Sequence, residues 1–157
     1  MTHGAAGKWY GFPQAPFEAA FVPRGESGVF AEAVTDDTAA VILEPVQGIA
    51  GAVDLGKPYL EAAREATRRR GAMLIFDEVQ CGMGRTGAAF AAQMHGVTPD
   101  ILPVAKGLAG GFPAGAVLLS ADAARGLKEG DLGTTFGGGA SRVRPDRGCD
   151  RRDRVGG

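Results

Sequence analysis

Lys106 is the residue in this sequence whose surroundings point most directly to chemistry. It follows the apolar run Ile101–Val104 and opens the glycine-rich segment Lys106-Gly107-Leu108-Ala109-Gly110-Gly111. A lysine at the end of a buried strand is desolvated, which favours its neutral form. Because a neutral lysine can form a Schiff base with a carbonyl compound, the sequence predicts a nucleophile at this position. The ordinary alternative is a solvated lysine in a turn.

A carboxylate ends a second apolar run. Leu74-Ile75-Phe76 is followed directly by Asp77. In open α/β sheets, ligands bind at the carboxyl ends of the strands, so Asp77 and Lys106 are expected at the same edge. A Schiff-base lysine together with a carboxylate for a pyridinium nitrogen is characteristic of pyridoxal phosphate (PLP) chemistry. Taken singly, an Asp at the end of a strand is more often a turn or cap residue.

Three further segments have both a functional and a structural interpretation. Gly107, Gly110 and Gly111 would allow a close approach of backbone to a ligand, or would simply form turns. The hydroxyls of Thr134 and Thr135 stand among glycines and suit a phosphate or a polar turn. Arg85 in Gly84-Arg85-Thr86-Gly87 could bind a carboxylate bidentately or form a structural salt bridge.

The elements that must position these residues alternate between strands and helices. We expect strands at 39–44, 72–77, 101–104 and 116–120, and helices at 29–34, 58–70, 88–95 and 121–128. The continuous apolar run 39–44 predicts a strand that is covered on both faces. The order of strand, helix and strand predicts an α/β fold with a mostly parallel sheet and flanking helices.

Composition narrows the class of protein. The chain has 157 residues, 45% of them hydrophobic, and a net charge of −1, which gives no reason to expect nucleic acid or an anionic membrane as partner. Cys81 and Cys149 have neither metal-ligand spacing nor a disulfide framework, so we expect a cytoplasmic protein with reduced thiols. We expect no signal peptide and no membrane span.

The chain divides into three parts by composition. Residues 1–28 form an irregular, aromatic-rich lead-in that is expected to lie over a core. Residues 29–138 contain all the predicted strands and helices. Residues 139–157 contain six Arg and three Asp but only one type of large apolar residue, valine, and this tail is expected to be disordered.

The motifs in this order resemble those of the class III PLP-dependent aminotransferases, most closely the acetylornithine/ornithine aminotransferase branch. They cover Val29 to Gly138 well and the lead-in loosely. The motifs are Leu43-Glu44-Pro45-Val46-Gln47-Gly48, Phe76-Asp77-Glu78-Val79-Gln80, Gly82-Met83-Gly84-Arg85-Thr86-Gly87, Pro99-Asp100-Ile101, Ala105-Lys106-Gly107 and Gly133-Thr134-Thr135-Phe136-Gly137-Gly138. The resemblance implies part of the large domain of the fold-type I PLP-dependent transferases.

The resemblance also implies a role for individual residues. Lys106 would carry PLP as a Schiff base and move the substrate proton, and Asp77 would pair with the ring nitrogen. Val79 would pack on the ring and Gln80 would approach its phenolic oxygen, with Glu78 in the same cofactor-binding segment. Thr135 would reach the PLP phosphate of a neighbouring subunit in a homodimer with shared active sites, and Thr134 would lie near that subunit's substrate.

The resemblance implies amino transfer from an acetylornithine-like, ornithine-like or other ω-amine donor to 2-oxoglutarate. The metabolic pathway that it implies is arginine biosynthesis. Relatives of this branch usually have Glu where this chain has Ile49, which leaves the donor open. We expect the chain to be a fragment that is inactive alone. The alternatives are an aminomutase or an ω-amino acid:pyruvate transaminase of the same class, or a non-catalytic remnant.

Overall fold

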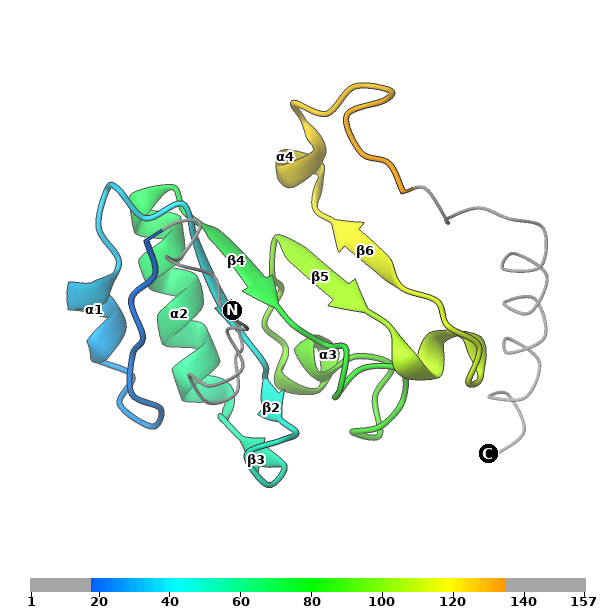
Figure 1. Ribbon diagram of the computed structural model, residues 1–157. Helices are drawn as coiled ribbons and strands as arrows, with labels where there is room; N and C mark the ends of the chain where they lie inside the picture. Colours follow the sequence, from blue (N-terminus) through cyan, green and yellow to red (C-terminus); the bar gives the residue numbers. More distant parts are fainter. Residues whose placement is uncertain (1–17, 135–157) are drawn as a thin grey trace.

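Four strands form the main sheet of the computed structural model, which describes residues 18–134 (Figure 1). They are β1 (Ala40–Leu43), β4 (Met73–Phe76), β5 (Ile101–Val104) and β6 (Ala116–Leu119), and they lie side by side in that order. β1, β4 and β5 are parallel, whereas β6 runs antiparallel to β5. The predicted mixed α/β fold with a mostly parallel sheet is therefore confirmed.

A small antiparallel hairpin was not predicted from the sequence. Its strands, β2 (Val46–Gln47) and β3 (Val53–Asp54), follow β1 after Pro45. The N–H of Leu55 donates to the carbonyl of Pro45 over 3.0 Å, which closes the base of the hairpin. The hairpin thus returns the chain to β1 before the next helix begins.

The helices are short apart from α2 (Lys57–Arg70), which connects β3 to β4. Pro58 stands in its first turn, arginines fill its last turn, and Gly71 ends it with a φ of 68°. A left-handed residue at this position is best supplied by glycine, as the sequence indicates. The other helices are α1 (Val29–Ala33), α3 (Ala91–His95), the 3₁₀ helix η2 (Lys106–Ala109) and α4 (Ala121–Ala124).

The prediction of a helix over 121–128 is too long. Ser120 caps α4, because its hydroxyl accepts a hydrogen bond from the N–H of Ala123 over 3.1 Å. The helix then ends at Ala124, and none of its residues is buried. Local propensity without an apolar face to pack cannot extend such a helix far.

The core lies on one face of the sheet. Leu74 and Phe76 of β4 are fully buried and belong to the same cluster as Leu60 and Ala63 of α2. The alternate residues of β4 and β5 are only partly buried. The prediction that strand 39–44 is covered on both faces is wrong for the described residues: β1 is an edge strand, and Ile42 is exposed.

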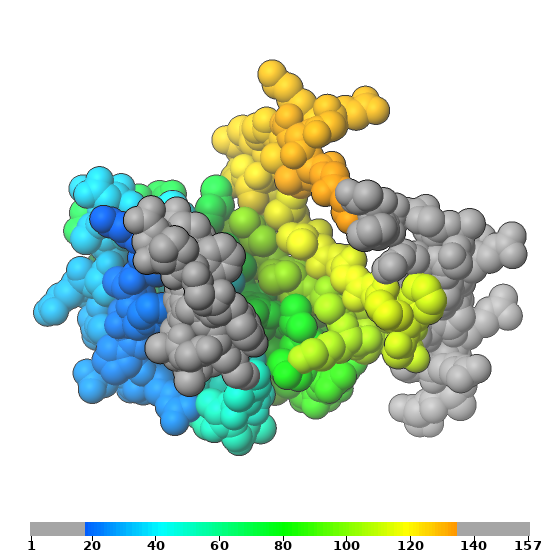
Figure 2. Space-filling view, viewed as in Figure 1, coloured from blue at the N-terminus to red at the C-terminus, as the bar shows by residue number. Residues whose placement is uncertain are grey.

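Two regions flank this core. At one side, Val22 packs against the cluster and the hydroxyl of Tyr59 donates to the carbonyl of Pro23, which connects residues 22 and 23 of the lead-in to the core. At the other side, α4 and the segment that follows it project from the rest of the surface (Figure 2). The tail 139–157 lies outside the described residues.

Candidate functional site

Three parallel strands deliver charged side chains to one edge of the sheet. Glu44 follows β1, Asp77 follows β4, and Lys106 lies two residues after β5. Burial raises the pKa of Glu44 above its usual value, and the Gly48 N–H that donates to its carboxylate over 3.3 Å lowers it. The negative charge of Asp77 raises the same pKa, and the positive charge of Lys106 lowers it. Glu44 therefore lies close enough to Asp77 and to Lys106 to be affected by the charge of each.

The backbone of the segment 77–80 continues the hydrogen bonding of the sheet. The N–H of Asp77 donates to the carbonyl of Leu43 over 2.9 Å, and the N–H of Glu78 donates to the carbonyl of Pro103 over 3.1 Å. A turn follows, in which the N–H of Val79 donates to Oδ1 of Asp77 over 3.1 Å. The segment is thus held between the ends of β1 and β5.

Gln80 lies against the β2 end of the hairpin. A Cβ atom placed on Gly48 would come within 3.3 Å of three carbons of the Gln80 side chain. Such a contact is tighter than normal packing, so a larger residue at 48 would displace Gln80. Glycine at this position therefore allows the hairpin to approach Gln80, the side chain that the family resemblance places near the phenolic oxygen of the cofactor.

Glu78 points away from solvent and is fully buried. Its two carboxylate oxygens accept hydrogen bonds from the N–H groups of Ala91 and Ala92, at the start of α3, each over 2.7 Å. Burial raises the pKa of Glu78, while these two N–H groups and the nearby His95 lower it. The sequence did not predict this contact with α3, because the partners are 13 and 14 residues away.

Lys106 begins the 3₁₀ helix η2 in a left-handed backbone conformation, with a φ of 49°. Residues other than glycine adopt this region at a cost of about 1–2 kcal/mol. Such strain is retained mainly where surrounding structure or function requires it. The expectation that Lys106 is desolvated is wrong for the described residues, since its side chain is exposed in a surface turn.

An open cleft of about 580 Å³ lies beside Lys106. Arg85 faces the same cleft, which is completed by the glycine-rich segment 107–114. Arg85 is exposed and forms no ion pair with any residue between 18 and 134, so the proposed structural salt bridge is not found there. The cleft is positively charged and open enough to admit a small anion.

The threonine motif lies elsewhere. Thr134 is exposed, it follows α4 at the end of the described residues, and it does not line the cleft beside Lys106. Thr135 lies outside the described residues. The structure therefore brings Asp77 and Lys106 together at one edge but does not bring Thr134 to them within this chain.

Cys81 adds no reactive thiol to the site. It is buried, and its thiol donates weakly to the carbonyl of Asp77 over 3.8 Å. Desolvation raises the pKa of this thiol to about 11, so it remains protonated at neutral pH.

Within residues 18–134 there is no cluster of side chains able to hold a metal ion. No helix in this range is long and apolar enough to cross a membrane.

Comparison with known proteins identifies the family. The family model "Aminotransferase class-III" matches residues 20–144. The chain belongs to the class III aminotransferases. It is 51% identical over 128 residues to the acetylornithine aminotransferase of Methanocaldococcus jannaschii, and 50% identical over 135 residues to that of Mycobacterium tuberculosis. These matches cover 82% and 86% of the chain but only 32% and 34% of the relatives.

The solved structures agree with this assignment to the class III aminotransferases. An ornithine aminotransferase from Toxoplasma gondii, described with partial occupancy of PLP at its active site, matches with a TM-score of 0.68 and 35% identity. The match covers 78% of this chain and 30% of the other. Enzymes of this family use PLP, and the predicted fold of the PLP-dependent transferases is confirmed. This class III aminotransferase chain spans about a third of the length of the curated relatives it matches.

Proposed function

We propose that this chain is part of a PLP-dependent aminotransferase. It would bind the cofactor covalently at the aldehyde group and through a carboxylate at the ring nitrogen. The observation that carries the proposal is the convergence of Asp77 and Lys106, with Glu44, at the carboxyl edge of three parallel strands. An amine and a carboxylate at one edge fit the carbonyl and the ring nitrogen of PLP. When bound, PLP supplies an electron sink for the carbanion that forms at the substrate Cα.

Individual residues of this chain would have separate roles in binding the cofactor and in proton transfer. Lys106 would attach the aldehyde and move the proton at the substrate Cα, and exposure at the cleft leaves its amine accessible. The Asp77 carboxylate, oriented by the N–H of Val79, would keep the ring nitrogen protonated. Val79 and Gln80 would contact the ring and its phenolic oxygen, with Glu78 in the same segment.

The amino donor, the amino acceptor and the oligomeric state are proposed for a protein of the full length of the curated relatives. We propose amino transfer from an acetylornithine-like or ornithine-like donor to 2-oxoglutarate, in a cytoplasmic homodimer. The similarity to acetylornithine aminotransferases supports this donor class. Thr134 does not line the cleft beside Lys106, which supports roles for Thr134 and Thr135 in a neighbouring subunit. By itself, the present chain would have little or no transaminase activity.

Covalent trapping tests the proposal. The purified chain is incubated with PLP, reduced with borohydride and analysed by peptide mass spectrometry. We expect a phosphopyridoxyl group on Lys106 in preference to the other lysines. Lys106→Ala should remove that modification, and the exposed Lys128→Ala should leave it unchanged. Equal labelling of Lys106 and Lys128 would show ordinary surface reactivity and contradict the proposal.

A further inference from the structure

We propose that Glu78 is a positioning residue, whose buried carboxylate fixes the segment 77–80 against α3 so that Asp77 and Gln80 face the cofactor. The inference rests on the proposed function above. It assigns Glu78 an indirect role in cofactor binding, through the backbone and not through contact with PLP.

The first support is the geometry of the carboxylate. Glu78 is 0% exposed, and each of its oxygens accepts a 2.7 Å hydrogen bond from α3. A buried carboxylate is costly unless its oxygens are satisfied, so the side chain and the start of α3 hold one another in place. Any shift of the segment 77–80 would break both hydrogen bonds.

The second support is the close packing behind Glu78. The N–H of Gly82 donates to the Glu78 carbonyl over 2.9 Å. A Cβ atom at Gly82 would lie 2.7 Å from that carbonyl oxygen and 3.2 Å from Oε2. Only glycine fits here without displacing Glu78, so both ends of Glu78 are fixed by their neighbours.

The third support is that α3 connects back to the hairpin. At its end, the buried Nε2 atom of His95 lies 3.0 Å from Oδ1 of Asp54 in β3. The contact is close but poorly aligned for a hydrogen bond, since Nε2 has no hydrogen-bond partner within the described residues. The hairpin then returns to Gln80 through Gly48. Contacts thus run from segment 77–80 to α3, from α3 to the hairpin, and from the hairpin back to Gln80.

The test compares Glu78→Gln with Thr67→Val in the whole 157-residue chain. Thr67 is also fully buried and polar, but its hydroxyl bonds only within α2, to the carbonyls of Ala63 and Arg64. Glu65→Gln, at an exposed position of α2, controls for loss of charge. Urea titrations give the global stability of each variant, so that the other measurements are compared at an equal folded fraction.

The deciding measurement is amide hydrogen exchange at Asp77, Glu78 and Val79, followed by NMR. We expect Glu78→Gln to increase exchange at these amides about tenfold or more, since a hydrogen bond to a buried charge is lost. Thr67→Val and Glu65→Gln should not change it beyond their effect on global stability. Unchanged exchange at residues 77–79 in Glu78→Gln would overturn the proposal.

Covalent trapping with PLP separates this inference from the proposed function. If the wild-type chain is labelled at Lys106, Glu78→Gln should need about tenfold more PLP for half-maximal labelling, while Thr67→Val should not. Equal labelling of the two variants would count against a positioning role. Failure of the wild-type chain to be labelled would contradict the proposed function, and the exchange measurement would still decide whether Glu78 fixes the segment.

Discussion

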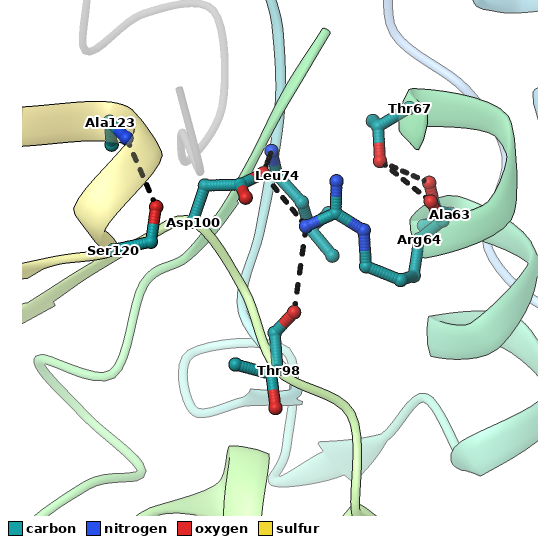
Figure 3. Close-up of polar contacts among 8 residues, drawn as sticks. All are labelled: Ala63, Arg64, Thr67, Leu74, Thr98, Asp100, Ser120 and Ala123. Atoms are coloured by element: carbon teal, nitrogen blue, oxygen red, sulfur yellow. Dashed lines mark hydrogen bonds and ion pairs between the residues drawn. The ribbon is translucent and has the colours of Figure 1, made fainter. Parts of the chain in front are cut away.

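Charged side chains are buried and paired at the amino edge of the main sheet, whereas Lys106 at the carboxyl edge is exposed. At the amino edge, Nη1 of Arg64 and Oδ2 of Asp100 form a largely buried ion pair at 2.7 Å, and the same carboxylate accepts a hydrogen bond from the N–H of Leu74 over 2.7 Å (Figure 3). At the carboxyl edge, Lys106 is exposed and in a strained backbone conformation. The first edge uses charge to hold elements together, and the second keeps an amine accessible.

Asp100 shows how much the amino edge depends on one residue. Its carboxylate connects α2 to β4, and its carbonyl accepts a hydrogen bond from the N–H of Ser120, which caps α4 (Figure 3). Arg64 also donates to the carbonyl of Thr98 over 3.5 Å. The Pro99-Asp100-Ile101 motif is thus explained by structure at the edge opposite the candidate site.

The largest expected effect on stability follows from this comparison. Asp100→Ala leaves the Arg64 guanidinium buried without its carboxylate, and we expect a loss of about 3–5 kcal/mol in the free energy of unfolding. Urea denaturation followed by circular dichroism measures it. Asp36→Ala is the matched control, because it removes an exposed ion pair with Arg70 and should cost no more than about 1 kcal/mol. Equal losses in the two variants would remove the distinction between the edges.

At the carboxyl edge, substitutions of Lys106 should separate stability from function. Lys106→Gly and Lys106→Ala both remove the amine, and neither should be labelled by PLP at position 106. Only glycine relaxes the positive φ, so Lys106→Gly should be about 0.5–1 kcal/mol more stable than Lys106→Ala. Thermal and urea denaturation of the two variants check this difference. A less stable glycine variant would show that the strain at Lys106 is not real.

A smaller effect concerns pH and Cys81, whose buried thiol contacts the carbonyl of Asp77. Burial raises the pKa of its thiol from 9.0 to about 11, so the folded state holds the thiol proton more tightly than the unfolded state. The stability that this proton contributes is complete below pH 9 and is lost as the pH rises from 9 towards 11. We expect Cys81→Ala to show a shallower decline in stability over this window, measured by urea titration at several pH values. Parallel declines would mean that Cys81 is not desolvated.

The smallest expected effect on stability is at Ile49, which is 75% exposed after β2. Ile49→Glu should change the free energy of unfolding by no more than about 0.5 kcal/mol. In the longer protein, we expect it to shift the preference among amine donors towards acetylornithine or ornithine, because it restores the residue common in that branch. A panel of donors measures the ratio of kcat/KM values. An unchanged ratio would favour a specificity determinant elsewhere in the protein.

Part of the fold could be predicted because its signals are local. Helix α2 is marked by Pro58, the terminal arginines and Gly71, and β4 and β5 are marked by short apolar runs. The positions of Asp77 and Lys106 at one edge follow from the rule for parallel strands. The hairpin β2–β3 escaped prediction because two-residue strands carry almost no periodic pattern.

The sequence by itself determined the order of the main-sheet strands and of helix α2, the family and the two residues proposed to anchor PLP, because these depend on local patterns and on motifs in a fixed order. Only the tertiary structure decided that Lys106 is exposed, that β1 is an edge strand, that Glu78 binds α3 and that Asp100 holds the opposite edge. Burial and buried hydrogen bonds depend on which distant segments meet. No pattern of neighbouring residues contains that information.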